Sequence, residues 1–358
     1  MDNPLGQRLR ELPGPLLLTG HTGFKGTWMT FLLEYLNVPL VGYSLFADKD
    51  SLYDRADRAG AIPEVFADIR DYETLEKFVG LYKPSTIIHM AAQPLVLKSY
   101  ESPRETFDVN VMGTVNILDI AFRKDYVKAI IIVTTDKVYR NANFGQAFIE
   151  SDPLEGKDPY SASKVGAEAV VAAWQHIAKV SGGPRIVSVR AGNVIGGGDF
   201  AENRIIPDLI RGVMAANPVN VRNPNSARPW QHVLDPLAGY IVCLESIIDV
   251  QKSDSFNFGP IEPSIRVRDL VTQAEKLYGD RLKTNYENLK EPSILESQAL
   301  SLDSTLATRY LGWTPVWNQR TAIEKTFLWW KNLIDLKESP RKLCNLDIEL
   351  FLMNMDGS

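Results

Sequence analysis

The chain of 358 residues carries 39 Lys and Arg against 44 Asp and Glu, a net charge of −5, and 45% of its residues are hydrophobic. These proportions indicate a globular protein with a sizeable core. No basic tract stands out and no apolar run reaches about 18 residues, so we expect neither nucleic acid nor membrane as a partner. With no signal-peptide pattern and only Cys243 and Cys344, the sequence predicts a cytoplasmic protein without a metal site.

The first motif along the chain is a glycine-rich turn, GHTGFKG, at residues 20–26. It lies between a short apolar run at 15–19, which predicts a strand, and an amphipathic helix pattern at 28–36. In this context G-x-x-G-x-x-G predicts a pyrophosphate cradle, because glycines permit the tight turn and N–H groups at the helix N-terminus reach phosphate. The predicted cofactor contacts in this turn are Gly20, Thr22, Gly23, Phe24, Lys25 and Gly26.

The end of the second predicted strand, at 39–43, distinguishes NAD from NADP. An acid there binds the ribose 2′-hydroxyl of NAD, whereas an Arg accepts the extra phosphate of NADP. The chain has Ser44, Leu45 and Phe46, which favours NAD, although Lys49 leaves NADP open. Further cofactor contacts are predicted at the ends of the next two strands: Asp68, Ile69, Ala91 and Ala92.

Residues 86–92 form a continuous apolar run, typical of a strand in a parallel sheet that is covered on both faces. His89 lies within this run and is predicted to be a packed core histidine. Residues 103–123 then predict one long helix, with an apolar stripe at 107, 111, 115, 118 and 122. A β-branched strand follows at 129–133.

The chemistry-bearing residues follow that strand. Thr135, Asp136 and Lys137 come at its carboxyl end, where α/β enzymes place reactive groups. Tyr160 and Lys164 lie four residues apart on a predicted helix, so they share one face. An ammonium beside a phenol lowers its pKa, and such a Tyr can take a proton from a hydroxyl. Taken alone, a Tyr–Lys pair at this spacing is more often a solvated pair on a helix surface.

The order of these elements predicts the fold class. Strands and helices alternate up to about residue 192, which indicates an α/β fold with a doubly wound, Rossmann-type parallel sheet. After Gly198 short helices, prolines and single strands replace this alternation. We therefore expect a dinucleotide-binding domain at 1–192 with a return segment near 230–260. Residues 193–229 and 261–358 are expected to form a smaller C-terminal α/β lobe that binds substrate.

Several blocks of sequence resemble the extended short-chain dehydrogenase/reductases that act on nucleotide sugars. They are GHTGFKG at 20–26, TTDKVY at 134–139, DPYSASK at 158–164 and RAGNVIGGGD at 190–199. Within that family the Asp-Lys pair at 136–137 is most similar to the CDP-glucose 4,6-dehydratases, since dTDP-glucose dehydratases typically have Asp-Glu. Leu97, Arg140 and Phe200 depart from the pattern, which has Arg, an acid and Trp there.

The resemblance implies a lyase that converts CDP-glucose to CDP-4-keto-6-deoxyglucose through tightly held NAD. It implies a homodimer formed through a four-helix bundle, in which the stripe at 107–122 and a second stripe at 165–173 meet. It also implies a set of substrate contacts: Gln93, Asn193, Arg204, Arg222, Arg228 and His232.

The same resemblance gives the catalytic residues their roles. Tyr160 removes the proton of the sugar 4-hydroxyl, while Lys164 lowers the pKa of Tyr160 and bonds the nicotinamide ribose. Thr135 holds the sugar O4, and Asp136, protonated, helps the 6-hydroxyl leave. Relatives have a Glu base at position 137. Lys137 can act as a base only when neutral, so it is either the C5 base or a group that polarises the keto oxygen.

Two alternatives stay open from the sequence. The first is a 4-epimerase, or a 4,6-dehydratase acting on another nucleoside diphosphate sugar. Epimerases generally lack the pair found at 136–137, which argues against the former. The second is a non-catalytic NAD-binding regulator on the same fold, which loss of Thr135, Tyr160 or Lys164 would have favoured; all three are present.

Overall fold

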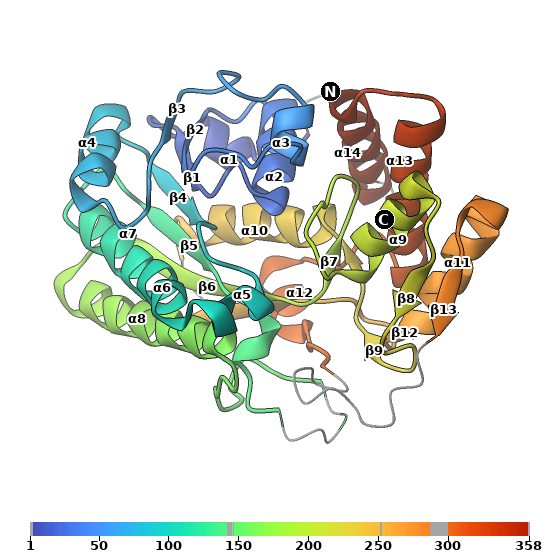
Figure 1. The fold of residues 1–358 in the computed structure, drawn as a ribbon. Coiled ribbons are helices and arrows are strands. Elements are labelled where there is room, and N and C mark those ends of the chain that lie inside the picture. Colours follow the sequence, from blue (N-terminus) through green and yellow to red (C-terminus); the bar gives the residue numbers. More distant parts are fainter. Residues whose placement is uncertain (1–2, 142–144, 146, 251–252, 287–299, 357–358) are drawn as a thin grey trace.

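The structure is a computed structural model that describes residues 3–141, 145, 147–250, 253–286 and 300–356 (Figure 1). At its centre lies a sheet of seven parallel strands in the order β11-β6-β5-β4-β1-β2-β3. The strands are β1 (Leu16–Thr19), β2 (Leu40–Ser44), β3 (Glu64–Phe66), β4 (Thr86–His89), β5 (Ala129–Val133), β6 (Arg185–Ala191) and β11 (Ser255–Phe258). The strand order reverses between β1 and β4, which confirms the predicted doubly wound sheet.

Continuous apolar strands arise because both faces of the sheet are covered. Along β5, residues 129, 131 and 133 enter one core, whereas residues 130 and 132 enter the other. On the second face lie α4 (Tyr72–Tyr82), α7 (Gly113–Phe122) and α8 (Pro159–Ser181). The first face is covered by α2 (Phe24–Tyr35) and α10 (Leu234–Ile247) (Figure 1).

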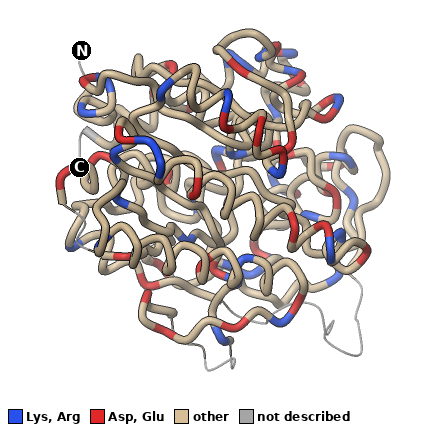
Figure 2. The backbone as a smooth tube through the Cα atoms, turned by 90° about the vertical axis from the view of Figure 1, so that its left-hand side faces the viewer, with Lys and Arg blue, Asp and Glu red and all other residues tan. Residues whose placement is uncertain are grey.

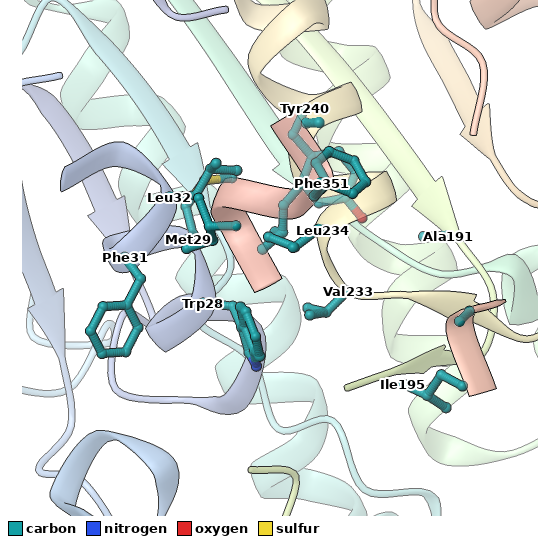
Figure 3. Close-up of a cluster of buried hydrophobic side chains, with 14 of the residues drawn as sticks. Trp28, Met29, Phe31, Leu32, Ala191, Ile195, Val233, Leu234, Tyr240 and Phe351 are labelled. Atoms are coloured by element: carbon teal, nitrogen blue, oxygen red, sulfur yellow. The ribbon is translucent and has the colours of Figure 1, made fainter. Parts of the chain in front are cut away.

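The helix of the glycine-rich turn is held by a large apolar cluster (Figure 3). In it, Trp28 and Leu32 of α2 pack with Leu234 of α10 and with Phe351 of the C-terminal helix α14 (Pro340–Asp356). The Trp28 indole Nε1 donates to the Gly197 carbonyl at 2.9 Å. The helix of the glycine-rich turn is therefore held by residues from three distant parts of the chain: Gly197, α10 and α14.

The helix predicted at 103–123 is confirmed, with one irregularity that the apolar pattern did not indicate. After the short helix α5 (Val96–Glu101), the chain continues without a break through α6 (Pro103–Phe107), a wide π-helical turn (Asp108–Met112) and α7. The wide turn points Asn110 inward, where its side chain accepts from Gln93 N at 2.8 Å and donates to Ser163 Oγ of α8 at 2.8 Å. A regular helix would give up these buried hydrogen bonds.

Past the sheet, small strand pairs and helices form the remainder of the structure, on the right of Figure 1. The strand pairs are β7 (Val194–Ile195) with β10 (Gln231–His232), β8 (Val219–Val221) with β13 (Thr284–Tyr286), and β9 (Ala227–Arg228) with β12 (Ile265–Arg266). The helices are α9 (Ile205–Ala215), α11 (Val267–Tyr278), α12 (Thr305–Leu311) and α13 (Gln319–Asp335); two short helices, α1 (Gln7–Arg10) and α3 (Leu52–Arg55), lie near the N-terminal strands. Residues 287–299 of the expected C-terminal lobe lie outside the described residues.

The surface carries both signs of charge. Figure 2 shows Lys and Arg interspersed with Asp and Glu along the whole chain. Among the described residues, no helix has the length and apolar character needed to cross a membrane, and no cluster of His, Cys, Asp or Glu could hold a metal ion.

Candidate active site

The carboxyl end of β5 and the start of α8 bring the predicted catalytic residues together. Thr135 is extended and caps the short turn Asp136–Val138. Asp158 caps α8 by accepting from Ser161 N at 2.9 Å, and Pro159 opens the helix, as suits its first turn. These two caps bring Tyr160 to Thr135, whose side chain hydrogen-bonds the Tyr160 side chain.

The protonation of Tyr160 differs from the expectation. Burial raises its pKa to about 12; the hydrogen bond with Thr135 opposes this rise, and the negative charge of Asp136 adds to it. The cation that opposes the rise is Arg204. Lys164 donates to the Val133 carbonyl at 3.0 Å, and burial lowers its own pKa to about 8. In the ligand-free protein, Tyr160 is therefore a neutral phenol.

Asp136 and Lys137 lie on the same turn but in different surroundings. Asp136 is 1% exposed, and its Oδ1 accepts from Thr135 Oγ1 at 3.0 Å. Its buried Oδ2 has no hydrogen-bond partner among the described residues. The Lys137 side chain is 39% exposed, and its Nζ lies 3.8 Å from Asp136 Oδ1. One carboxylate oxygen is thus buried without a hydrogen-bond partner, beside an accessible amine.

The glycine-rich turn has the shape that the motif predicts. Gly20 has φ +73°, and a Cβ on Gly26 would lie 2.1 Å from the Gly20 carbonyl oxygen. Gly23 is exposed, and a Cβ there would meet only that same oxygen, at 3.5 Å. Thr22 Oγ1 ties the turn to the end of β2 through Ser44 Oγ at 2.7 Å. The turn is an open cradle before the N-terminus of α2, and half-buried Phe24 and Lys25 begin that helix.

Lys25 reaches beyond the cradle, which its motif did not predict. Its Nζ donates to the Tyr240 hydroxyl of α10 at 2.9 Å. Burial, together with the positive charges of Lys164 and Arg204, lowers its pKa to about 7. Lys25 therefore belongs electrostatically to the cluster around Tyr160. Sequence gave no signal for Tyr240, because it lies on a helix more than 200 residues away.

The residues predicted to contact the far half of the cofactor are placed along the strand ends. The Asp68 carboxylate is 32% exposed and receives Arg70 Nη2 at 2.6 Å and Nε at 3.0 Å. The Ile69 side chain is 4% exposed, so only its backbone is left for a ligand. Ala91 and Ala92 are half-buried beside the cradle, where a Cβ on Gly20 would lie 2.7 Å from Ala91 N.

Gln93 and His232, which were expected to bind substrate, have protein groups as their partners. The Gln93 amide donates to Thr106 Oγ1 at 3.0 Å and to Leu95 O at 3.1 Å, and it accepts from Leu95 N at 2.7 Å. The His232 ring is fully buried, with its centroid 4.7 Å from that of Trp317. Both residues therefore organise the protein interior and offer no exposed group to a substrate, which corrects the expectation.

The other expected substrate contacts remain accessible. Arg204 Nη1 is paired with Asp199 Oδ2 at 2.8 Å, yet its side chain is 41% exposed. Arg222 is exposed, whereas Asn193 and Arg228 are half-buried. A cavity of about 490 Å³ lies between α9 and β8; Arg222 and Asn203 are among its lining residues, and none of the catalytic residues lines it. Its size suits a small-molecule ligand.

Arg140, one of the departures from the family pattern, points to solvent. Its side chain is 67% exposed and pairs with Glu155 at 2.9 Å. Leu97 is 42% exposed on α5, and Phe200 packs edge-on against Trp330 of α13. The side chains of Arg140 and Phe200 thus have their partners outside the catalytic turn.

Comparisons with known proteins agree with this arrangement. Residues 17–326 match the family model described as GDP-mannose 4,6 dehydratase. The chain is 38% identical over 325 residues to the CDP-glucose 4,6-dehydratase of Salmonella typhimurium, covering 88% of this chain and 90% of that protein. Its fold is similar to that of a dTDP-glucose 4,6-dehydratase from Streptomyces venezuelae, solved with NAD bound (TM-score 0.75, 22% identity, 91% of this chain and 99% of that chain).

It is also similar in fold to a Thermus thermophilus UDP-glucose 4-epimerase solved with NAD (TM-score 0.76, 22% identity, 89% of this chain and 100% of that chain). Dehydratases and epimerases thus share this fold, so the fold does not distinguish the two activities. The matching family model and the 38% identical relative are both described as 4,6-dehydratases. The chain belongs to the GDP-mannose 4,6-dehydratase family, a nucleotide-sugar branch of the extended short-chain dehydrogenase/reductases.

Proposed function

We propose that this protein is a lyase that converts CDP-glucose to CDP-4-keto-6-deoxyglucose. The observation that carries the proposal is the turn Thr135-Asp136-Lys137, which places a buried acid and an amine beside Tyr160. A 4-epimerase needs only the group that removes and returns the 4-hydroxyl proton, so the additional acid and amine favour dehydration. The name of the 38% identical relative supports CDP-glucose as the substrate.

The proposed cofactor is NAD, which accepts a hydride from the sugar C4 and returns it to C6. The open cradle of the glycine-rich turn fits its pyrophosphate, because no side chain covers the backbone at Gly23. Ser44, Leu45 and Phe46 after β2 include no cation for the extra phosphate of NADP. Asp68 and the backbone of Ile69 would hold the adenosine half, while Ala91 and Ala92 leave room for the cofactor.

The side chains of this chain supply the proton transfers. Tyr160 takes the 4-hydroxyl proton, and Thr135, hydrogen-bonded to it, positions the sugar O4. Lys164 fixes the nicotinamide ribose. The 4-ketone then acidifies C5–H, and Asp136, which must be protonated for this step, gives its proton to the departing 6-hydroxyl through Oδ2, the oxygen without a hydrogen-bond partner among the described residues. Lys137, the exposed amine, removes the C5 proton or polarises the keto oxygen.

The substrate is proposed to bind between the sheet and the small lobe formed by residues 193–229 and 261–358. The cavity between α9 and β8 would take the nucleoside, because Arg222 and Asn203, the neighbour of Arg204 in the chain, are among its lining residues. Arg222 and Arg228 would hold the diphosphate, to which guanidinium groups bind in a bidentate way. Asn193 would add a polar contact at the end of β6.

A panel of nucleotide glucoses tests the assignment. CDP-glucose should give a product with the alkaline absorbance of a 4-keto sugar, whereas the dTDP, UDP and GDP sugars should give much less. A faster reaction with another nucleotide sugar would support the dehydratase activity but assign the enzyme a different substrate. No product with any of them, from protein that binds NADH, would overturn the proposed reaction.

Replacing Gly26 by Ala should weaken NADH binding by about tenfold or more, because the new methyl collides with the Gly20 carbonyl and distorts the cradle. Fluorescence titration measures this directly. Gly80→Ala is the matched control: Gly80 lies in α4 with nothing within 4 Å of an added Cβ, so binding should be unchanged. Equal weakening in both variants would contradict the cradle assignment.

Replacing Arg228 by Ala should raise KM for CDP-glucose roughly 10- to 100-fold, the effect of losing one or two charge-assisted hydrogen bonds. The value of kcat should change much less, since the diphosphate is bound equally before and during the reaction. Arg309→Ala, on the exposed side of α12, is the matched control. A fall in kcat with unchanged KM would remove Arg228 from the diphosphate site.

We also propose that the protein forms a homodimer and is cytoplasmic. The layer formed by α6, α7 and α8 exposes apolar side chains, among them Phe107 at 41%, Met112 at 46% and Val180 at 72%. Such a face favours a homodimer through four helices. Both cysteines are buried and free, which suits a cytoplasmic enzyme.

A further inference from the structure

A buried ion pair lies behind the catalytic residues and has no part in the mechanism so far. Glu168 follows Lys164 by one turn of α8, and Arg190 lies on the neighbouring strand β6. The Arg190 Nε and Nη2 atoms each donate to a different oxygen of the Glu168 carboxylate, both at 2.8 Å. Glu168 is 6% exposed and Arg190 4%, so the pair is screened from water.

The pair connects three segments that carry the reaction. Thr134, next to Thr135, donates to Glu168 Oε1 at 2.6 Å, which ties the end of β5 to α8. On the other side, Arg190 Nη1 donates to the hydroxyl of Tyr139 at 2.8 Å, two residues after Lys137. This carboxylate and its guanidinium partner therefore join α8 to both ends of the catalytic turn, in addition to the hydrogen bonds of Lys164 with Val133 and of Tyr160 with Thr135.

The pair also supplies charge. Lys164 interacts electrostatically with Glu168 one turn later on α8, with Lys25 at the start of α2 and with His89 of β4, and Arg190 adds a positive charge bound to both oxygens of Glu168. Burial lowers the pKa of His89 to about 3, so it is neutral at pH 7, and Lys25 is a cation or a neutral amine. Among these described neighbours, Glu168 is the one that carries negative charge at neutral pH, and it opposes the loss of the Lys164 proton.

We propose that Glu168 is a positioning residue for the reaction: its buried carboxylate is the counter-ion that keeps Lys164 charged and joins α8 to the strand end that bears Thr135. The inference rests on the roles proposed for Tyr160 and Lys164. It adds a residue that touches neither substrate nor cofactor and acts through Lys164 and Thr134.

The decisive variant is Glu168→Gln, which keeps the shape and removes the charge. The ammonium of Lys164 would lose its proton at lower pH, because an opposite charge close by shifts a pKa by about one unit or more. Activity that requires charged Lys164 falls as pH rises through that pKa, so the basic limb of the kcat profile should move at least about one unit toward acid. The KM for CDP-glucose should change only a few-fold.

Ser188→Ala is the matched control. Ser188 Oγ donates to Glu168 Oε2 at 2.7 Å, so this variant loosens the same carboxylate and keeps its charge. Its basic limb should stay in place. Because Lys25 also titrates near neutrality, both variants are repeated in a Lys25→Met background, where the shift caused by Glu168→Gln should persist.

If Glu168→Gln does not fold, the double variant Glu168→Gln with Arg190→Gln leaves no unpaired buried charge and should still move the limb toward acid. An unmoved limb in folded protein, or an equal shift in Ser188→Ala, would overturn the inference. The variants Lys164→Met and Tyr160→Phe distinguish failure of the proposed active site from failure of the role proposed for Glu168. Full activity in both would refute the proposed site itself, whereas their inactivity with an unshifted Glu168→Gln profile would refute only the role of Glu168.

Discussion

Replacing Tyr160 by Phe should lower kcat roughly 10²- to 10⁴-fold, the contribution of a positioned acid–base group. The Phe ring fills the same buried space, so the fold and the KM for CDP-glucose should change little. The matched control is Tyr126→Phe. Tyr126 precedes the amino end of β5, away from the catalytic residues at its carboxyl end, and its hydroxyl donates to Val79 O at 3.2 Å. Loss of this hydroxyl should leave kcat unchanged. Activity of Tyr160→Phe within a few-fold of the parent would exclude Tyr160 as the base.

The protonation of Tyr160 gives a second measurement on the same variant. Because burial raises its pKa to about 12, only about one molecule in 10⁴ carries the phenolate at pH 8 without ligands. The phenolate absorbance of the ligand-free protein should therefore show no Tyr160 contribution below about pH 10, as judged by the difference from Tyr160→Phe. A contribution near neutral pH would mean that the protein alone prepares the phenolate; otherwise bound ligands must bring the positive charge.

The parallel sheet could be predicted from the sequence because its strands are short apolar runs, such as residues 129–133, that alternate with helix patterns. Tyr160 and Lys164 were found because their spacing is local to one helix. The protonation of Tyr160 was not, since it depends on burial and on Asp136 and Arg204, which other segments bring to the phenol. A Tyr–Lys spacing reports proximity along a helix and says nothing of how dry the surroundings are.

Other features also depend on long-range contacts. The apolar stripe at 107–122 correctly predicts a helix, but the wide turn at 108–112 within it depends on hydrogen bonds between Asn110 and the distant residues Gln93 and Ser163. Gln93 and His232 have side chains typical of ligand contacts, yet their partners are protein groups. For His232, these are Trp28 and Trp317, which lie far away in the sequence. Glu168 could have been predicted from the sequence, because it follows Lys164 by four residues and therefore lies on the same face of the helix.

Replacing Asp136 by Asn should separate oxidation at C4 from loss of the 6-hydroxyl. The amide keeps the shape of the carboxyl, which is buried and accepts from Thr135, but it cannot give the departing oxygen its proton. Overall kcat should fall roughly 10²- to 10⁴-fold. Exchange of the C5 proton should persist, because the 4-ketone still forms, so CDP-glucose recovered from deuterated solvent should carry deuterium at C5.

Replacing Lys137 by Met should give the complementary result and remove that exchange. The amine is 39% exposed and lies 3.8 Å from the Asp136 carboxylate. Its amine is thus in contact with water, and an amine acts as a base only in its neutral form. If Lys137 is the C5 base, Lys137→Met stops deuterium incorporation, whereas Lys179→Met, at the far, exposed end of α8, leaves it unchanged. Exchange at the native rate in Lys137→Met, combined with a lower kcat, would instead assign Lys137 to polarising the keto oxygen and require a different base on the C5 side of the sugar.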